Sequence, residues 1–366
     1  MVAKRHKLTG GSLMRKMQEH IVKGKRVFVG LEDSKRTWKL CVRCEGMIVH
    51  ETSMPAEYEN LRGYLRSRYP KCEVQLIYEA GFSGFWLCDL LTQEGIDCVV
   101  TPPHKVTEEK VNRVKVDKTD ARRLAKTLEV SDYTRCWIPD RAQREDRQVV
   151  RTLTQVQRDI VVTKNRIRRF LDWHGLNGEM PSGRWRDRDY ERVKEFRFRP
   201  SLQVCLDTYL RRLDDLKQTK SDLLGELRSL SKKERYSRLV ESKRRCPGVG
   251  WLSAIRFTLE WGDLSRFEDD KRFGSYLGLT ASEESSGDTV HRGRITHQGN
   301  PQVRSWLVEC AWRAIRIDPA LLNKFRKVWQ NTGSKKKAIV AVARKLAIRM
   351  RAVELSDEPY QLGVIR

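Results

Sequence analysis

The sequence lacks any long apolar run among its 366 residues. No stretch reaches the roughly 18 to 20 uninterrupted apolar residues that a membrane-spanning helix needs. The opening stretch, MVAKRHKLTGGSLMRKMQEH, also lacks the apolar core of a signal peptide. These absences argue against a membrane protein and an exported one, so we expect a cytoplasmic protein without a membrane partner.

A disulfide framework is missing as well. The chain holds 9 cysteines, an odd number, and they are scattered rather than grouped. We therefore expect reduced thiols. Cys41 and Cys44 form one CxxC pair, but neither a second pair nor a closely following histidine completes a zinc site. We interpret the two as buried strand thiols.

Acidic residues are far fewer than basic ones. The chain has 48 Asp and Glu residues against 73 Lys and Arg residues, a formal net charge of +25. Such an excess favours a polyanionic partner, and nucleic acid is the leading candidate. With 39% hydrophobic residues in 366, the chain is long enough for two domains, each with its own core, joined by a helical connector.

Strand-like and helix-like patterns alternate in the first third of the chain, after a basic arm at 1–24. Four segments alternate or run apolar as strands do, namely 26–43, 46–54, 74–80 and 97–103. Segments with helical spacing follow or separate them at 58–69, 85–95 and 117–130. This order predicts an α/β layer.

Long helical patterns dominate the middle of the chain. Residues 137–175 and 206–242 have charge-rich helical spacing, and the apolar residues of the second segment recur near heptad positions. They predict either an antiparallel hairpin or a dimerising coiled coil. The polar segment 177–200 between them, interrupted by Gly and Pro, is predicted to be a loop or insertion.

The sequence PGVG marks a turn near the start of the last third of the chain. It lies between a basic helix end and an apolar helix start, as in a helix-hairpin-helix unit. In such a unit Gly248 and Gly250 let backbone N–H groups approach a phosphate. The alternative is a plain turn between two helices.

Carboxylates recur at points where strands end and a helix begins. Glu32 and Asp33 end the first strand, Glu79 ends a central strand, and Asp117 and Asp120 lie one helical turn apart. Cleavage of a phosphodiester bond with divalent metal ions needs several carboxylates, contributed by different elements, to hold the ions. Taken one by one, each also fits a solvated surface residue or an ion-pair partner.

The stretch SEESSGDTVHRGRITHQGNPQVR, residues 282–304, sets two serines beside a glycine and several cations. A serine hydroxyl needs activation and a cationic surround to attack phosphorus. Candidates for that surround are Arg292, Arg294, His297 and Arg304. By its own composition the stretch also fits an ordinary linker.

These motifs together resemble the IS110 family of insertion-sequence transposases, which includes the Piv-type invertases. The stretches VGLEDSK, YEAGFSGFW, DKTDARRLA, PGVG and ESSGDTVHRGRITHQGNPQVR occur in the family's order and spacing, over nearly the whole chain. The resemblance implies three parts: a RuvC-like domain of ribonuclease-H fold at 25–136, a helical coiled-coil connector at 137–243, and a mainly helical C-terminal transposase domain at 244–366.

The resemblance also assigns residues. The family's second, third and fourth acids match Glu79, Asp117 and Asp120. Its first acid, an aspartate, falls on Glu32, whereas Asp33 is one step along and would face the opposite side of a strand. The implied ion of this all-oxygen set is Mg²⁺. The family's serine directly precedes the glycine, which places it at Ser286.

The activity that the resemblance implies is DNA transposition or site-specific recombination. Ser286 would attack DNA, leaving a covalent phosphoserine linkage and a free 3′ hydroxyl, with Mg²⁺ polarising the phosphate. Family members of this kind are also guided by a structured noncoding bridge RNA that pairs with donor and target DNA. We expect a dimer or tetramer.

One basic helix is a candidate contact for that RNA. It places Lys164, Arg166, Arg168 and Arg169 beside Phe170 and Trp173, and arginines with aromatic rings suit phosphate binding and base stacking. A charged coiled-coil face is the equally consistent alternative.

Two other functions fit the same residues. In a RuvC-like Holliday-junction endonuclease, metal-activated water would attack and Ser286 would only bind phosphate. In a non-catalytic nucleic-acid-binding protein, the carboxylates would be dispensable.

Overall fold

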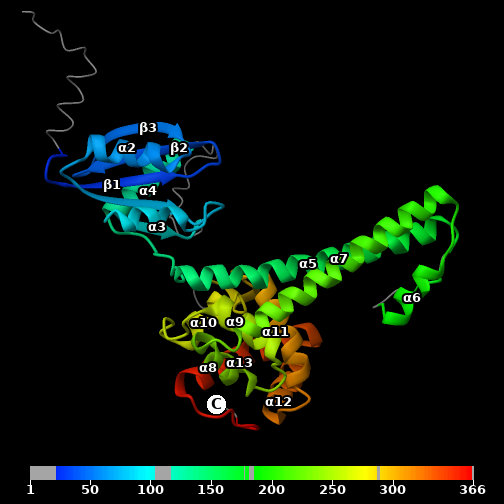
Figure 1. Cartoon of the computed structure of the whole chain (residues 1–366). Coiled ribbons are helices and arrows are strands. Elements are labelled where there is room, and N and C mark those ends of the chain that lie inside the picture. Colours follow the sequence, from blue (N-terminus) through cyan, green and yellow to red (C-terminus); the bar gives the residue numbers. More distant parts are fainter. Residues whose placement is uncertain (1–21, 104–116, 177, 181–184, 287–288, 365–366) are drawn as a thin grey trace, which may run out of the picture. The chain divides into compact units, whose positions relative to one another are not determined.

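The computed structural model describes residues 22–103, 117–176, 178–180, 185–286 and 289–364. Of the predicted basic arm, only the last three residues fall in these ranges. The chain divides into two compact units, residues 1–138 and 139–366 (Figure 1). Each unit is described by itself.

The N-terminal unit is built on a five-stranded sheet with the order β3-β2-β1-β4-β5. Its strands are β1 (Arg26–Glu32), β2 (Thr37–Cys44), β3 (Met47–Pro55), β4 (Glu73–Glu79) and β5 (Asp97–Thr101). Strands β1 to β3 form an antiparallel meander, whereas β4 and β5 run parallel to β1 and to each other. The predicted α/β layer is confirmed.

Helices cover both faces of this sheet. One face carries α2 (Tyr58–Arg68) and α3 (Trp86–Gln93), which share a core with the odd-numbered residues of β1, and the other face carries α4 (Asp117–Glu129). Ile77 and Val99 belong to the α4 side. Successive strand residues point to opposite faces, so this assignment fixes which side chains can meet α4.

The CxxC pair lies in β2, where residues three apart face opposite sides of the sheet. Cys41 packs against α4, whereas Cys44 belongs to the core on the α2 side. Both thiols are buried, and all nine cysteines are free. The interpretation of Cys41 and Cys44 as buried strand thiols is confirmed.

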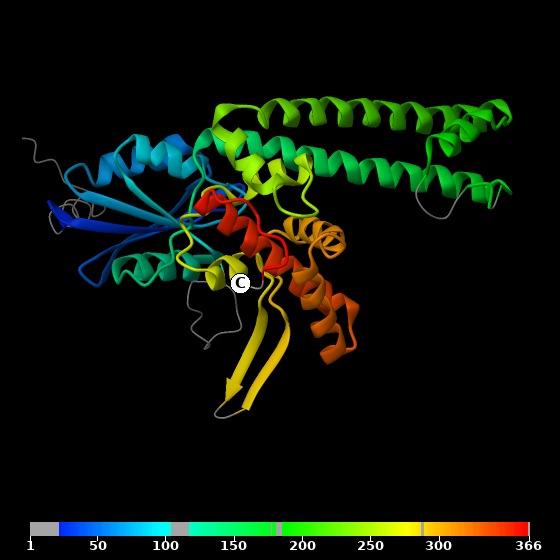
Figure 2. The same ribbon diagram turned by 90° about the horizontal axis from the view of Figure 1, so that it is seen from below.

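Two long helices of the C-terminal unit form an antiparallel hairpin (Figure 2). They are α5 (Arg141–Trp173), capped by the Asp140 carboxylate, and α7 (Pro200–Leu230). The two pair within one chain, so the predicted antiparallel hairpin is confirmed. No helix in the described ranges combines the length and the apolar character needed to cross a bilayer.

The prediction of one continuous helix over 206–242 was wrong. Helix α7 ends at Leu230, and α8 (Glu234–Arg244) follows as a separate element. At Lys233 the backbone is extended, with φ −59° and ψ 139°. The break lets Tyr236 and Val240 of α8 enter the helical core. Burial of these two side chains stabilises the fold more than continuing α7 along its heptad pattern would.

For 177–200, predicted to be a loop or insertion, the loop alternative was wrong in part, because helix α6 (Asp187–Glu195) forms there. The Asp189 carboxylate accepts a hydrogen bond from the Arg186 N–H at 2.6 Å, which closes the first turn. Tyr190 and Val193, one turn apart, are buried in a small core with Leu171 of α5. Burial of this apolar pair fixes the helix in a segment of polar composition.

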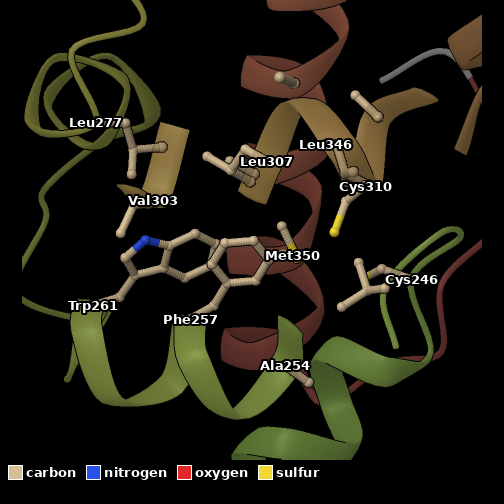
Figure 3. Close-up of a cluster of buried hydrophobic side chains, with 14 of the residues drawn as sticks. Cys246, Ala254, Phe257, Trp261, Leu277, Val303, Leu307, Cys310, Leu346 and Met350 are labelled. Carbon is tan, nitrogen blue, oxygen red and sulfur yellow. The ribbon is translucent and has the colours of Figure 1, made fainter. Parts of the chain in front are cut away.

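The rest of the C-terminal unit surrounds one large core (Figure 3). Its elements are α9 (Trp251–Trp261), α10 (Asp270–Tyr276), β6 (Ala281–Ser286), β7 (Thr289–Ile295), α11 (Pro301–Ala314), α12 (Pro319–Thr332) and α13 (Lys335–Ser356). Phe257 and Trp261 stack with ring centroids 4.5 Å apart. Leu307 of α11 and Met350 of α13 belong to the same core.

A buried carboxylate ties α12 and α13 to the C-terminal segment. Asp318 accepts hydrogen bonds from the backbone N–H groups of Ala320 (2.9 Å) and Gly363 (3.1 Å), from the Tyr360 hydroxyl, and from Arg349 Nη1 (2.6 Å). Burial opposes ionisation, but these donors outweigh it and lower the pKa of Asp318.

We therefore expect the Asp318 contribution to stability to depend on pH. Because its pKa is depressed in the folded state, the contribution is present above the unfolded pKa of about 3.9 and is lost as the pH falls through the folded value. Asp318→Asn should lower the free energy of unfolding at pH 7 and flatten its acid dependence. Urea titrations of both proteins between pH 7 and pH 3 test this; parallel profiles would contradict it.

Candidate functional site

Two glutamates end adjacent parallel strands of the N-terminal sheet. The β1–β4 register pairs Leu31 with Tyr78, so Glu32 and Glu79 are the next residues along the two strands. Ile77 faces α4, and Glu79, two residues further along, shares that face. Glu32 lies on the same side as Gly30, which touches α4. The two glutamates therefore lie at one edge, on one face of the sheet.

Helix α4 approaches this edge unusually closely at Gly30. A Cβ atom there would lie 2.2 Å from the Ala121 carbonyl oxygen and 2.4 Å from the Ala125 nitrogen. Only a residue without a side chain permits this distance. The contact brings the first turn of α4, with Asp117 and Asp120, toward the ends of β1 and β4.

A single guanidinium joins the acids of β4 and α4. Arg123 Nη2 lies 3.2 Å from Glu79 Oε1 and 3.3 Å from Asp120 Oδ1. The positive charge offsets the repulsion between two carboxylates that would otherwise oppose their approach. The Asp117 side chain lies outside the described residues, so its position relative to this group stays a prediction.

Asp33 lies in a different setting from Glu32. Its carboxylate approaches the loop after β4, where Ser83 hydrogen-bonds to it, and burial raises its pKa. Its Oδ2 atom is buried and accepts no hydrogen bond from the described part of the chain. Of the two acids at the end of β1, Glu32 is the one on the face shared with Glu79 and α4.

The donor set of this edge fits a hard cation such as Mg²⁺, because every candidate ligand is a carboxylate oxygen. A further oxygen is close by: Thr101, paired with Glu79 in the sheet, is fully buried, and its hydroxyl makes no hydrogen bond with the described residues. No group of three or more metal-ligating side chains forms among the residues described. A cation would need the Asp117 carboxylate, and Arg123 would have to turn aside.

Arg123 and Thr101 were not among the residues predicted from the sequence. The Arg123 contact with Asp120 spans three positions of one helix, a spacing that the sequence shows. The place of Thr101 depends on the β4–β5 register, which the sequence does not display.

The serine stretch folds as a two-stranded hairpin. Strands β6 and β7 are antiparallel, with Ser285 opposite Val290 and Ser286 opposite Thr289. Ser286 is thus the last residue of β6, at the far end of a hairpin that extends away from the helices of its unit (Figure 2). The side chains of 283–292, including Arg292, lie outside the described residues.

The cations predicted around the serine fall into two groups. Arg294 and His297 are exposed at the base of the hairpin. Arg304 is partly buried, and its Nη1 donates to the backbone oxygens of Gln298 (2.7 Å) and Gly299 (3.2 Å). Burial lowers the pKa of Arg304. Its observed contacts brace the turn after β7, and a contact with nucleic acid stays a prediction.

The PGVG segment joins α8 to α9, and its two glycines differ. Gly248 has φ +77°, and a Cβ atom there would lie 2.4 Å from the Cys310 carbonyl oxygen of α11. Its need for glycine therefore comes from packing within the protein. Gly250 is the exposed N-cap residue of α9, with open space where a Cβ would be. Gly250 is the better placed of the two for a phosphate.

The basic segment of α5 presents an exposed face near the end of the long hairpin. Arg166, Arg169 and Trp173 follow helical spacing, and Trp173 is 86% exposed. Lys164 lies 5.6 Å from the Trp185 ring, and Arg168 donates to Asn165 Oδ1 at 3.2 Å. Two of the four predicted cations thus share a face with an exposed aromatic ring.

Two family models match the chain and together span more than half of it. Residues 244–326 match the family described as "Transposase IS116/IS110/IS902 family". Residues 29–174 match a second one described as "Transposase", the DEDD type of IS110.

Curated relatives agree with the family models. The chain is 28% identical over 311 residues to the putative transposase y4qE of Sinorhizobium fredii, covering 83% of this chain and 74% of that protein. It is 21% identical to the transposase for insertion sequence element IS1533 of Leptospira borgpetersenii, covering 93% and 99%. It is 28% identical to the pilin gene-inverting protein of Moraxella bovis, covering 31% and 36%.

Proposed function

Because the chain belongs to the IS110 family of transposases, we propose that it cuts and rejoins donor and target DNA through a covalent phosphoserine intermediate. The family implies DNA cleavage and strand transfer. The net charge of +25 suits a protein that holds DNA duplexes.

The N-terminal unit supplies the acids in this proposal. Its strand order, an antiparallel meander followed by two parallel strands with α4 on one face, supports a RuvC-like, ribonuclease-H-type fold. The observation that carries the proposal is the Arg123 guanidinium, which contacts Glu79 and Asp120 at the edge of the sheet where Glu32 ends the neighbouring strand. With Asp117 they would hold Mg²⁺, which when bound supplies polarisation of the scissile phosphate.

The serine step is proposed for Ser286. Its Oγ forms a bond to phosphorus while the bond from phosphorus to the 3′ oxygen breaks, and the serine proton passes by way of a base to that oxygen. The products are a phosphoserine linkage and a free 3′ hydroxyl. In the reverse sense, a 3′ hydroxyl of the exchanged strand attacks the linkage and restores the serine, so no other reactant is consumed.

The serine and the acids belong to different units of the chain. The proposed reaction therefore needs an N-terminal unit and a hairpin from the same chain or from two chains to meet at one phosphate. In a dimer or tetramer, the N-terminal unit and the hairpin could come from the same chain or from two different chains.

Guidance by a bridge RNA is part of the proposal. The exposed face of Arg166, Arg169 and Trp173 supports it, because guanidinium groups and an exposed ring suit phosphates and unpaired bases.

Glu79→Gln tests the function. With flanking RNA, donor and target duplexes and Mg²⁺, we expect cleavage to fall by about 100-fold or more, the scale of losing one electrostatic contact to a transition state. The control is Glu73→Gln at the other end of β4, where Glu73 forms an exposed pair with Arg26 at 2.8 Å. Cleavage by Glu79→Gln at the wild-type rate would exclude the acid-dependent reaction.

A further inference from the structure

A large cavity lies at the base of the β6–β7 hairpin, within the C-terminal unit. Its volume is about 890 Å³, and it is bounded by the ends of both strands and by α12 and α13. We call it the basic pocket. Six of its lining residues carry a positive charge, namely Arg294, Lys324, Lys336, Lys337, Arg344 and Lys345.

Among the residues that the structure describes, no carboxylate lies at ion-pair distance from the cations of the basic pocket. The lining residues that the structure describes include no carboxylate. Two other arginines of α13 show the contrast: Arg349 pairs with Asp318 at 2.6 Å and Arg351 with Asp270 at 3.0 Å. Cations gathered in this way repel one another, so the arrangement favours a bound polyanion.

The interior of the pocket is apolar. Leu279, Ile295, Val340, Ala341 and Ile348 contribute its aliphatic lining. Four of the cations are exposed and form the rim of the pocket, namely Arg294, Lys324, Lys336 and Lys337. Cations beside an apolar lining match a nucleotide, whose phosphates carry charge and whose base presents a flat, weakly polar face. A simple anion would leave the apolar surface unused.

The position of the pocket relates it to the serine. Ala281 lines the pocket and begins β6, and Ser286 ends this six-residue strand. At about 3.3 Å per residue, the two positions lie roughly 17 Å apart. A B-form strand rises about 3.4 Å per nucleotide, so this distance corresponds to about five nucleotides.

We propose that the basic pocket binds a nucleotide of the DNA strand that Ser286 cuts, about five nucleotides from the scissile phosphate. The inference rests on the proposed function, because the hairpin that forms one wall of the pocket also carries the serine. The proposed occupant is DNA rather than RNA for the same reason, because a strand attacked by the serine would run past this wall.

A matched pair of double variants tests the charge. Lys336→Gln with Lys337→Gln removes two rim cations, whereas Lys232→Gln with Lys233→Gln removes two adjacent, exposed lysines between α7 and α8. Binding of labelled single-stranded DNA is measured by fluorescence anisotropy over a range of salt. We expect the rim variant to bind about 10-fold more weakly, with a salt slope smaller by about 1 to 2. The control should match wild type, and equal losses in both would overturn the proposal.

A second variant tests the interior without changing charge. Ala341→Trp places a large side chain in the pocket, and we expect weaker DNA binding with an unchanged salt slope. Unfolding midpoints establish that the variant is folded; a folded variant with wild-type binding would overturn the proposal. The proposal would also be overturned if Ala341→Trp weakened binding of an RNA of the same sequence but not binding of the DNA.

Photo-crosslinking separates this inference from the proposed function. DNA carrying a photoreactive base about five nucleotides from the cut site is bound to Ser286→Ala protein, which cannot form an adduct. A crosslink to α13 supports the pocket even if wild-type protein never forms a phosphoserine. A crosslink only outside the pocket overturns it even if the adduct forms.

Discussion

Ser286→Ala is expected to abolish the covalent protein–DNA adduct and to slow strand exchange by a factor on the order of 10⁶, the scale of removing a catalytic nucleophile. Alanine keeps the strand backbone and removes only the hydroxyl. The adduct is measured on denaturing gels with labelled DNA, Mg²⁺ and the flanking RNA.

Ser285→Ala is the matched control for this variant. Ser285 and Ser286 are neighbours in β6, paired with Val290 and Thr289, and successive residues of a strand alternate between its two faces. We expect Ser285→Ala to retain the adduct. If Ser285→Ala alone lost it, the nucleophile would be the other serine.

A third outcome would change the reaction class. Cleavage without an adduct that survives Ser286→Ala but is lost in Glu79→Gln would indicate attack by water. The protein would then act at its acidic edge as a junction-type nuclease, with the hairpin as a phosphate-binding element.

Lys243→Met is expected to lower the free energy of unfolding by about 3 to 5 kcal/mol, because it leaves a buried carboxylate without its partner. Lys243 of α8 is completely buried, and its ammonium group pairs with Glu354 of α13, which is 6% exposed. Lys243 also donates to the Leu239 carbonyl oxygen at 3.3 Å. Burial lowers the pKa of Lys243 in spite of the neighbouring carboxylate.

Two further variants show whether the lost charge is the cause. The double variant Lys243→Met with Glu354→Gln removes both charges and should recover much of the loss. Arg244→Gln breaks the adjacent exposed pair with Glu241 and should change stability by less than about 1 kcal/mol. Urea unfolding followed by circular dichroism measures all three. A double variant as unstable as Lys243→Met would point to packing instead.

The elements predicted correctly are those in which the spacing of apolar residues along the sequence agrees with which side chains are buried. Strands β1, β2, β4 and β5 were predicted because each contains a run of buried apolar residues. Helix α5 was predicted because its helical period is long and is ended by Gly175. Helix α6 was missed because only Tyr190 and Val193 reveal it. The break after Leu230 was missed because the reason for it, burial of Tyr236 in a distant core, is tertiary.

In the candidate site, too, features that follow from local sequence patterns were predicted, whereas those that depend on tertiary contacts were not. The family pattern places the first acid at Glu32, and alternation along a strand, which is a local rule, sets Asp33 on the opposite face. The contacts of Arg304 and the packing of Gly248 involve α11 and the turn before it, which spacing alone does not place. The basic pocket combines residues of β7, α12 and α13 that carry no shared motif.

Gly30 has a consequence for how this protein can be engineered. Since even a methyl group at position 30 would overlap the backbone at Ala121 and Ala125, the strand and the helix that carry the acids form one inseparable part. A library that varies these three positions would mostly yield misassembled scaffolds. Variation confined to the hairpin and the pocket would leave that part intact, so new DNA preferences are best sought there.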